Sequence, residues 1–170
     1  KPGDVWYDYM TNSTYGGAVP TAFVDSASAT ALNDYSDQLI TFDDYNGTPT
    51  TQPRYRINGV LDTGQTVLSN VDKIMMASDS WMQYNAASGK WALVINKQTT
   101  SSMSFDDTNI IGNITVGSVD LNQSINQVQA QFNDSTNRDQ AGYVNIATPS
   151  YLLYPNEPVN KYTINYSLIN

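Results

Sequence analysis

The middle of the chain carries three patterns in direct succession and restricts the possible fold more than any other part. Residues 55–61 are rich in β-forming side chains and predict a strand, in which Gly59 indicates a bulge or a close contact. Apolar side chains then recur at helical spacing over residues 67–78 and predict an amphipathic helix. Asp62 and Gln65 have the spacing of a capping box, so we expect them at its start.

The third pattern is an alternation of apolar and polar residues over 81–95, interrupted by small residues at 87–89. It predicts a β-hairpin that carries Trp81 and Trp91 as neighbours on one face. Residues 55–96 should therefore form a strand, a helix and a two-stranded ribbon, which together are an α+β unit.

Two short helices are expected before this unit. Residues 1–15 begin with a proline suited to the first turn of a helix, and Gly16 follows as a stop signal. Residues 21–38 have a second helical pattern, with Ser26 and Ser28 as candidate caps.

The remaining elements are predicted from alternation and turn residues. Residues 39–45 alternate as a strand, 46–47 are the strongest turn signal, and 48–53 predict a polar loop. Residues 96–104 are polar and mark a boundary. Beyond it the patterns predict, in order, a helical turn at 106–111, strands at 114–119 and 125–132, a polar loop at 134–142, and strands at 143–147 and 162–169.

The expected fold class is α+β: short N-terminal helices, the central strand–helix–hairpin unit and a β-rich C-terminal part. We place the domain border after residue 100, so that 1–100 form an α+β segment and 101–170 a β-rich segment. Because the chain stops directly after an alternating run, we expect it to be a fragment of a longer protein, incomplete at its C-terminus.

Charge and composition exclude several classes of function. The net charge is −8 and the pI is near 4.1, which argues against nucleic acid or an anionic membrane as a main partner. The chain has neither Cys nor His, so disulfides, thiol nucleophiles, common zinc sites and Ser–His or Cys–His triads are ruled out. No apolar run is long enough to span a bilayer.

Acidic residues supply the candidate catalytic and metal-binding groups. A glycosidase needs two carboxyl groups across a bond, and a calcium loop needs a specific spacing that this chain does not have. Since Asp is favoured at turns and caps, we prefer that structural interpretation. The candidate pairs are Asp4/Asp8, Asp43/Asp44 and Asp106/Asp107, and the candidate calcium loops are residues 42–47 and 134–139.

Three further groups of residues have a functional and a structural interpretation. Aromatic rings could stack on a sugar but are more often core or interface; they are Trp6, Tyr7, Tyr9, Tyr15, Trp81, Tyr84 and Trp91. Six sequons follow at least as easily from composition as from glycosylation; they lie at Asn12, Asn46, Asn113, Asn122, Asn133 and Asn165. We expect ion pairs at the arginines, which are Arg54, Arg56 and Arg138.

Three segments resemble, in order, those of phage tail-tip proteins of the host-specificity or J class. They are residues 4–17 (DVWYDYMTNSTYGG) with Pro20 after them, 54–63 (RYRINGVLDT) and 154–160 (YPNEPVN). Lys1 departs from the family, which usually has Asn there. These are patterns of packing and turns rather than catalytic signatures.

The resemblance implies a structural role in the virion. Such proteins form a trimeric hub that closes the tail tube and carries the fibre or spike, in contact with other tail-tip and tail-tube proteins. The parts of the longer polypeptide outside this chain would reach the host receptor. The resemblance implies no enzymatic activity, and it transfers no catalytic, cofactor-binding or metal-binding residue.

Two alternatives remain open. The aromatic residues, Asp pairs and sequons are also typical of a secreted carbohydrate-binding module or glycosidase fragment. A bacterial surface adhesin domain would explain the acidity and the β content equally well.

Overall fold

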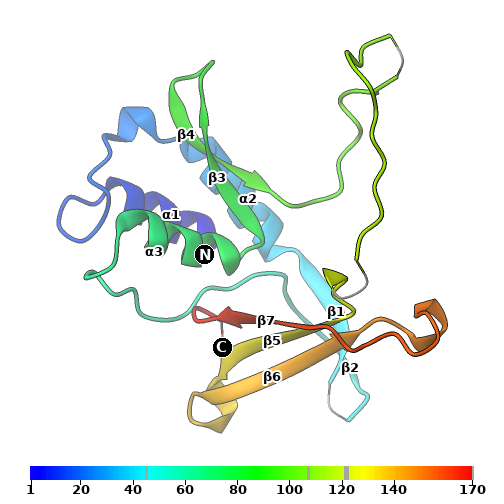
Figure 1. Cartoon of the computed structure of the whole chain (residues 1–170). Coiled ribbons are helices and arrows are strands. Elements are labelled where there is room, and N and C mark those ends of the chain that lie inside the picture. Colours follow the sequence, from blue (N-terminus) through cyan, green and yellow to red (C-terminus); the bar gives the residue numbers. More distant parts are fainter. Residues whose placement is uncertain (45, 107, 121–122, 170) are drawn as a thin grey trace. The chain divides into compact units, whose positions relative to one another are not determined.

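The computed structural model describes residues 1–44, 46–106, 108–120 and 123–169 (Figure 1). The expected α+β class is confirmed: short helices and small sheets follow one another along the chain. The helices are α1 (Pro2–Thr11), α2 (Ser26–Asp37) and α3 (Val67–Met76). The strands are β1 (Leu39–Asp43), β2 (Pro49–Pro53), β3 (Ser80–Asn85), β4 (Lys90–Ile95), β5 (Gln127–Asp134), β6 (Gln140–Ala147) and β7 (Lys161–Tyr166).

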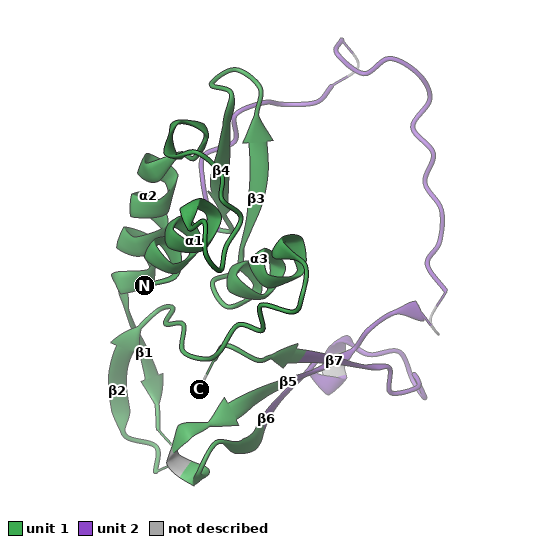
Figure 2. Ribbon diagram, turned by 90° about the vertical axis from the view of Figure 1, so that its left-hand side faces the viewer, with its two compact units in different colours: residues 1–96, 131–142, 165–170 green, residues 97–130, 143–164 purple. Residues whose placement is uncertain are grey.

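The chain divides into two compact units that are not consecutive in sequence (Figure 2). Unit 1 contains Lys1–Asn96 together with Gln131–Gly142 and Asn165–Asn170, and unit 2 contains Lys97–Ala130 and Tyr143–Ile164. The chain first passes from unit 1 to unit 2 after Asn96, close to the border that we placed after residue 100. The organisation of 1–100 and 101–170 as separate domains stays a prediction.

The core of unit 1 lies where the three helices meet the β3–β4 hairpin. Helix α1 packs against α2 and α3, and α2 packs against β4. Trp6 of α1, Leu32 of α2 and Ile74 of α3 are fully buried at this centre. Because each helix contributes one apolar face, the amphipathic spacing seen in the sequence is what closes this core.

Helix α3 begins later than its capping-box pattern predicts. The cap is Thr66, whose side chain accepts a hydrogen bond from the Ser69 N–H. Asp62 instead closes a turn before the helix, where its carboxylate accepts from the Gly64 N–H at 2.8 Å. The Asp62–Gln65 contact does form, but within that turn.

The predicted strand over residues 55–61 is wrong. The backbone N–H groups here donate to separate parts of the chain. The Tyr55 N–H donates to the Ser36 carbonyl, and that of Arg54, just before the segment, donates to the Gln38 carbonyl. The Asn58 N–H donates to the Leu168 carbonyl at 2.9 Å. Because no single neighbouring strand accepts these bonds, the segment is extended without belonging to a sheet.

The hairpin is confirmed, but the placement of its tryptophans is wrong. Trp91 lies opposite Tyr84, and the two rings meet edge to face with centroids 5.3 Å apart. Trp81 lies opposite Val94. Since side chains alternate between faces along a strand, Trp81 and Tyr84 are on opposite faces, and so are the two tryptophans.

The strands and caps predicted for the other parts of the chain agree with the structure only in part. The predicted loop 48–53 is wrong, because it contains β2, which pairs with β1 around the expected turn at Gly47. The cap of α2 is Asp25 rather than Ser26 or Ser28. Strands β6, β5 and β7 form one sheet in that order, with β6 beginning inside the loop predicted over 134–142. The predicted strand 114–119 is wrong, since that stretch has no secondary structure.

In unit 2, Asn126 joins the start of β5 to the turn before β7. Its Nδ2 donates to the Pro158 carbonyl at 2.8 Å and to Glu157 at 3.1 Å. Its Oδ1 accepts from the Asn160 N–H at 2.9 Å. Both ends of the amide are therefore satisfied in a structural contact.

Asn70 is a fully buried amide on α3, and it connects two other segments. Its Nδ2 donates to Tyr9 Oη at 2.8 Å and to the Asp62 carbonyl at 2.9 Å. We expect Asn70→Ala to lower the free energy of unfolding by about 2–4 kcal/mol, because a cavity forms and two acceptors, one of them buried, lose their donor.

Urea denaturation checks this expectation, with Asp72→Ala at an exposed position of the same helix as the control. A loss at Asn70 no larger than that of the control would show that the amide does not hold these segments together.

Candidate functional site

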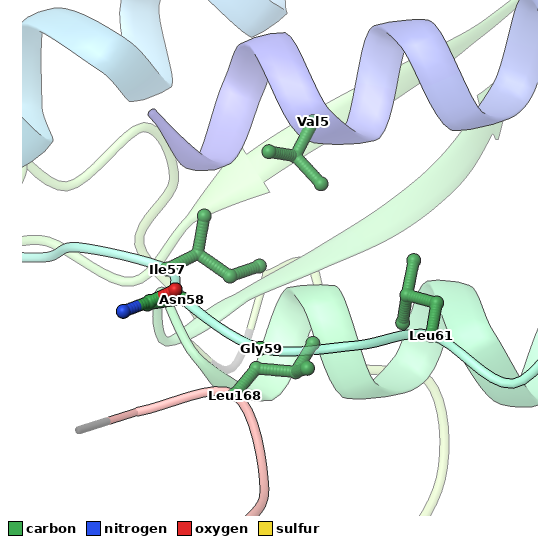
Figure 3. Close-up of a pocket in the computed structure, with 6 residues that line it drawn as sticks. All are labelled: Val5, Ile57, Asn58, Gly59, Leu61 and Leu168. Carbon is green, nitrogen blue, oxygen red and sulfur yellow. The ribbon is translucent and has the colours of Figure 1, made fainter. Parts of the chain in front are cut away.

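An apolar groove runs beside α1 in unit 1. One part of it holds about 160 Å³ and is bordered by α1, by the segment after β2 and by the C-terminal segment. Figure 3 shows the side chains of Val5, Ile57 and Leu61 converging, with Leu168 beside the backbone of Gly59. The lining residues are Val5, Ile57, Asn58, Gly59, Leu61 and Leu168. We call this hollow the α1 groove.

Gly59 is required by a close approach rather than by a bulge. A Cβ at this position would lie 2.8 Å from Leu168 Cδ2 and 3.3 Å from the Ser167 carbonyl oxygen. Leu168 itself is only 3% exposed. The absence of a side chain at Gly59 therefore lets the C-terminal segment reach the core, which agrees with the close contact that the sequence indicated.

The groove continues toward a polar end of about 280 Å³ that adds Asp8, Tyr9, Tyr15 and Thr63. Tyr15 Oη donates to Asp8 Oδ2 at 2.5 Å. This hydrogen bond is the main cause that raises the pKa of Tyr15 above its ordinary value, and desolvation adds to it. A phenol with a raised pKa stays protonated at neutral pH, so Tyr15 does not supply an activated nucleophile.

Each candidate carboxylate pair has at least one member in a hydrogen bond within the chain. Asp4 accepts from Asn33 Nδ2 at 2.7 Å, and Asp8 accepts from Tyr15. Asp44 accepts from the N–H groups of Asn46 and Thr48 in the β1–β2 turn. Asp106 accepts from Thr108, which lowers the pKa of Asp106, while Asp107 lies outside the described residues. The contacts of Asp44 and Asp106 are the turn chemistry that we preferred, whereas Asp4 and Asp8 contact side chains of other segments.

Neither predicted calcium loop assembles a ligand set in the described chain. No group of three or more acidic side chains able to hold a metal ion occurs within 1–44, 46–106, 108–120 and 123–169. Residues 42–47 form a tight turn around Asp44, and Tyr45 lies outside the described residues. Asp139, at the end of 134–139, has a left-handed backbone with a φ of 57°.

Two of the three arginines contact α2. Arg56 Nη2 lies 2.8 Å from Asp37 Oδ1, and Lys1 Nζ lies 2.6 Å from Asp37 Oδ2. Arg54 stacks on the Tyr35 ring, with its guanidinium carbon 4.6 Å from the ring centroid. The ion pair that we expected for Arg56 is therefore present, whereas Arg138 is exposed with a φ of 55°.

The aromatic residues do not share one surface. Trp6 and Tyr9 are buried in the core, while Tyr15, Trp81 and Tyr84 are about half exposed. Since Trp81 and Tyr84 are on opposite faces of the hairpin, they cannot stack on one sugar chain together. Of the sequons, Asn12 accepts from the Thr14 N–H in a turn, and Asn122 lies outside the described residues.

A second hollow, which sequence reasoning missed, lies between α3 and β3. It holds about 420 Å³ and is mainly apolar, with one charged residue in its lining. Three of its side chains are strongly exposed: Leu68 by 61%, Met76 by 44% and Trp81 by 49%. Its lining residues are Leu68, Asp72, Met75, Met76, Ser80, Trp81 and Met82. We call it the β3 groove, and apolar residues at the outer edge of the α3 pattern are the signal that could have revealed it.

Comparisons with known proteins identify no relative. The chain matches no protein-family model, and no curated protein is significantly similar to it. Within the described part of the chain, no helix has the length and apolarity to cross a bilayer.

We expect Gly59→Val to displace Leu168 from the core and to lower the free energy of unfolding by about 2–4 kcal/mol, comparable to Leu168→Ala. Hydrogen exchange at the Asn58 amide reports the displacement directly, because this N–H is bonded to the Leu168 carbonyl. Gly47→Ala is the control, since Gly47 has a φ of 75° but no atom within 4 Å of an added Cβ. Unchanged protection of Asn58 in Gly59→Val would contradict the contact.

Asp37 should make the free energy of unfolding depend on pH in the acidic range. The hydrogen bond from Lys1, with that from Arg56, holds the pKa of Asp37 below its ordinary value. Wild type should therefore be more stable than Asp37→Asn above about pH 4, the ordinary range for Asp. This small advantage should disappear as pH falls through the lowered pKa, which urea midpoints measured from pH 7 down to pH 2 will show. A constant difference over this range would exclude the ion pair as its source.

Proposed function

We propose that this chain is a structural component of a bacteriophage tail tip, part of the central hub that links the tail tube to the fibre or spike. In this role it acts in the virion as a segment of a homotrimer, in contact with other tail-tip and tail-tube proteins. The host receptor is reached by other parts of the assembly. The chain has no enzymatic role and no cofactor in this proposal.

The main support for the proposal is that two of the segments that resemble tail-tip proteins lie against each other in unit 1. Residues 4–17 supply Val5, Asp8, Tyr9 and Tyr15 to the α1 groove and its polar end. Residues 54–63 supply Ile57, Gly59, Leu61 and Thr63 to the same place. A resemblance made of packing patterns is supported when its separate parts pack on each other.

The exposed apolar surface also supports a subunit role. In unit 1, Leu68 and Trp81 are exposed at the β3 groove, and in unit 2 Ile111 and Val116 are exposed by 90% or more. Monomeric soluble proteins rarely leave large apolar side chains so open in groups. Interfaces with neighbouring subunits would cover them, as the hub proposal requires.

The alternative of a carbohydrate-binding module or glycosidase fragment has less support. Its aromatic residues do not share one surface, and Asp4, Asp8, Asp44 and Asp106 accept hydrogen bonds from within the chain. The acidity leaves the adhesin alternative open.

Immunogold electron microscopy tests the proposal. An antibody raised against the chain should label purified phage particles at the tail end distant from the head, and mass spectrometry of those particles should recover its peptides. Pre-absorption of the antibody with the purified chain is the control. Recovery of the native protein only in the particle-free fraction would refute the proposal.

A further inference from the structure

We propose that residues 108–119 of one copy of this chain add as a strand to the open edge of β3 in a second copy, with their apolar side chains in the β3 groove. The inference rests on the homomeric part of the proposed function but not on its location in a virion. Three features of the chain support this pairing: the outer edge of β3, a strand-forming segment outside any sheet, and complementary chemistry between the two.

The open edge belongs to β3. In the hairpin, β4 is the inner strand: it packs against α2, and Trp91 makes a bridge to Val24 (Figure 2). Strand β3 pairs with β4 on one side and, in the part of the chain that the structure describes, with no strand on the other. Alternate N–H and C=O groups of an edge strand point outward and are free to accept another strand.

The matching segment is the stretch 108–119 in unit 2. Residues 114–119 have the composition and alternation of a strand, yet Figure 1 shows this stretch without an arrow or a helix. Its apolar side chains are open: Ile111 is fully exposed, Ile114 is 69% exposed and Val116 is 90% exposed. Asn109 and Ile110 donate to the Asp106 carbonyl in a turn, but residues 114–119 pair with no strand in the described part of the chain. A strand-forming sequence of this kind is suited to pair with another chain.

The absence of charge lets this segment approach a second copy of the chain. Residues 108–119 contain no charged side chain, whereas Asp107 and Asp120 flank them directly. Two copies with a net charge of −8 repel each other, so an uncharged stretch is the part that can approach a second copy at least cost. The flanking aspartates limit how far pairing can extend.

The β3 groove fits side chains of this kind. Met75, Met76 and Met82 line it beside Trp81, and methionine adapts its shape to an incoming apolar group. Once a strand is paired along β3, every second side chain points to the same face. Isoleucine and valine from the added strand would then cover the exposed Trp81 and Met76.

Cross-linking between copies tests this pairing, because the chain has no cysteine of its own. One preparation carries Gln83→Cys in β3, and a second, of different mass through a tag, carries Ser118→Cys, which shares the face of Ile114 and Val116 in a strand. Equal amounts are mixed and treated with a short bismaleimide, which tolerates a shift in register. The mixed-mass dimer should exceed that of Gln83→Cys with Ser101→Cys by about tenfold, a difference of about 1.4 kcal/mol in pairing.

A charge variant provides the second measurement. Ile114→Lys with Val116→Lys, added to the Ser118→Cys chain, should lower the dimer yield about tenfold or more. Both side chains are exposed in the single chain, so its fold should be unaffected. Ser101→Lys with Ser102→Lys adds the same charge outside the segment and should leave the yield unchanged.

Three results would overturn the inference. The first is a mixed dimer no more abundant than with Ser101→Cys, and the second is equal loss in both lysine variants. The third is a chain carrying both cysteines that cross-links only within itself at every dilution. If the native-length protein is a trimer by light scattering but the mixed dimer is absent, the strand pairing fails and the homomeric assignment stands.

Discussion

The contact between Gly59 and Leu168 holds together segments of unit 1 that are far apart in the sequence. Leu168 is buried because Gly59 has no side chain at the place where Leu168 Cδ2 lies. The same contact gives the Asn58 N–H an acceptor and closes one side of the α1 groove. Without it, residues 55–61 would lose both a hydrogen-bond partner and an apolar neighbour, and the groove would lose a wall.

Polar contacts also hold separate segments of unit 1 together. Asn70 ties α3 to Tyr9 of α1 and to the turn at Asp62, and Asp37 ties the end of α2 to Arg56. Buried contacts of this kind lose much when one partner is removed, while exposed ion pairs contribute little. The buried amide should therefore matter more to the stability of unit 1 than the charged cluster.

Exposed apolar surface is the feature that a single copy of the chain leaves unexplained. The β3 groove and residues 108–119 both present apolar side chains to solvent. Pairing between copies would bury both at once and would complete the sheet that β3 leaves open. Strand addition gives affinity through main-chain hydrogen bonds and specificity through side chains in pockets, which suits a large assembly built from identical subunits.

The sequence by itself determined the helices, the β3–β4 hairpin and the turn at Gly47, because these depend on local spacing and turn chemistry. It also indicated the close contact at Gly59. Only the tertiary structure decided that residues 55–61 lie outside any sheet, that 48–53 contain a strand and that 114–119 do not. Strand formation requires a partner from elsewhere in the chain, and an alternating pattern does not say whether one exists. For the same reason the α1 groove, which combines residues from both ends of the chain, could not be read from spacing alone.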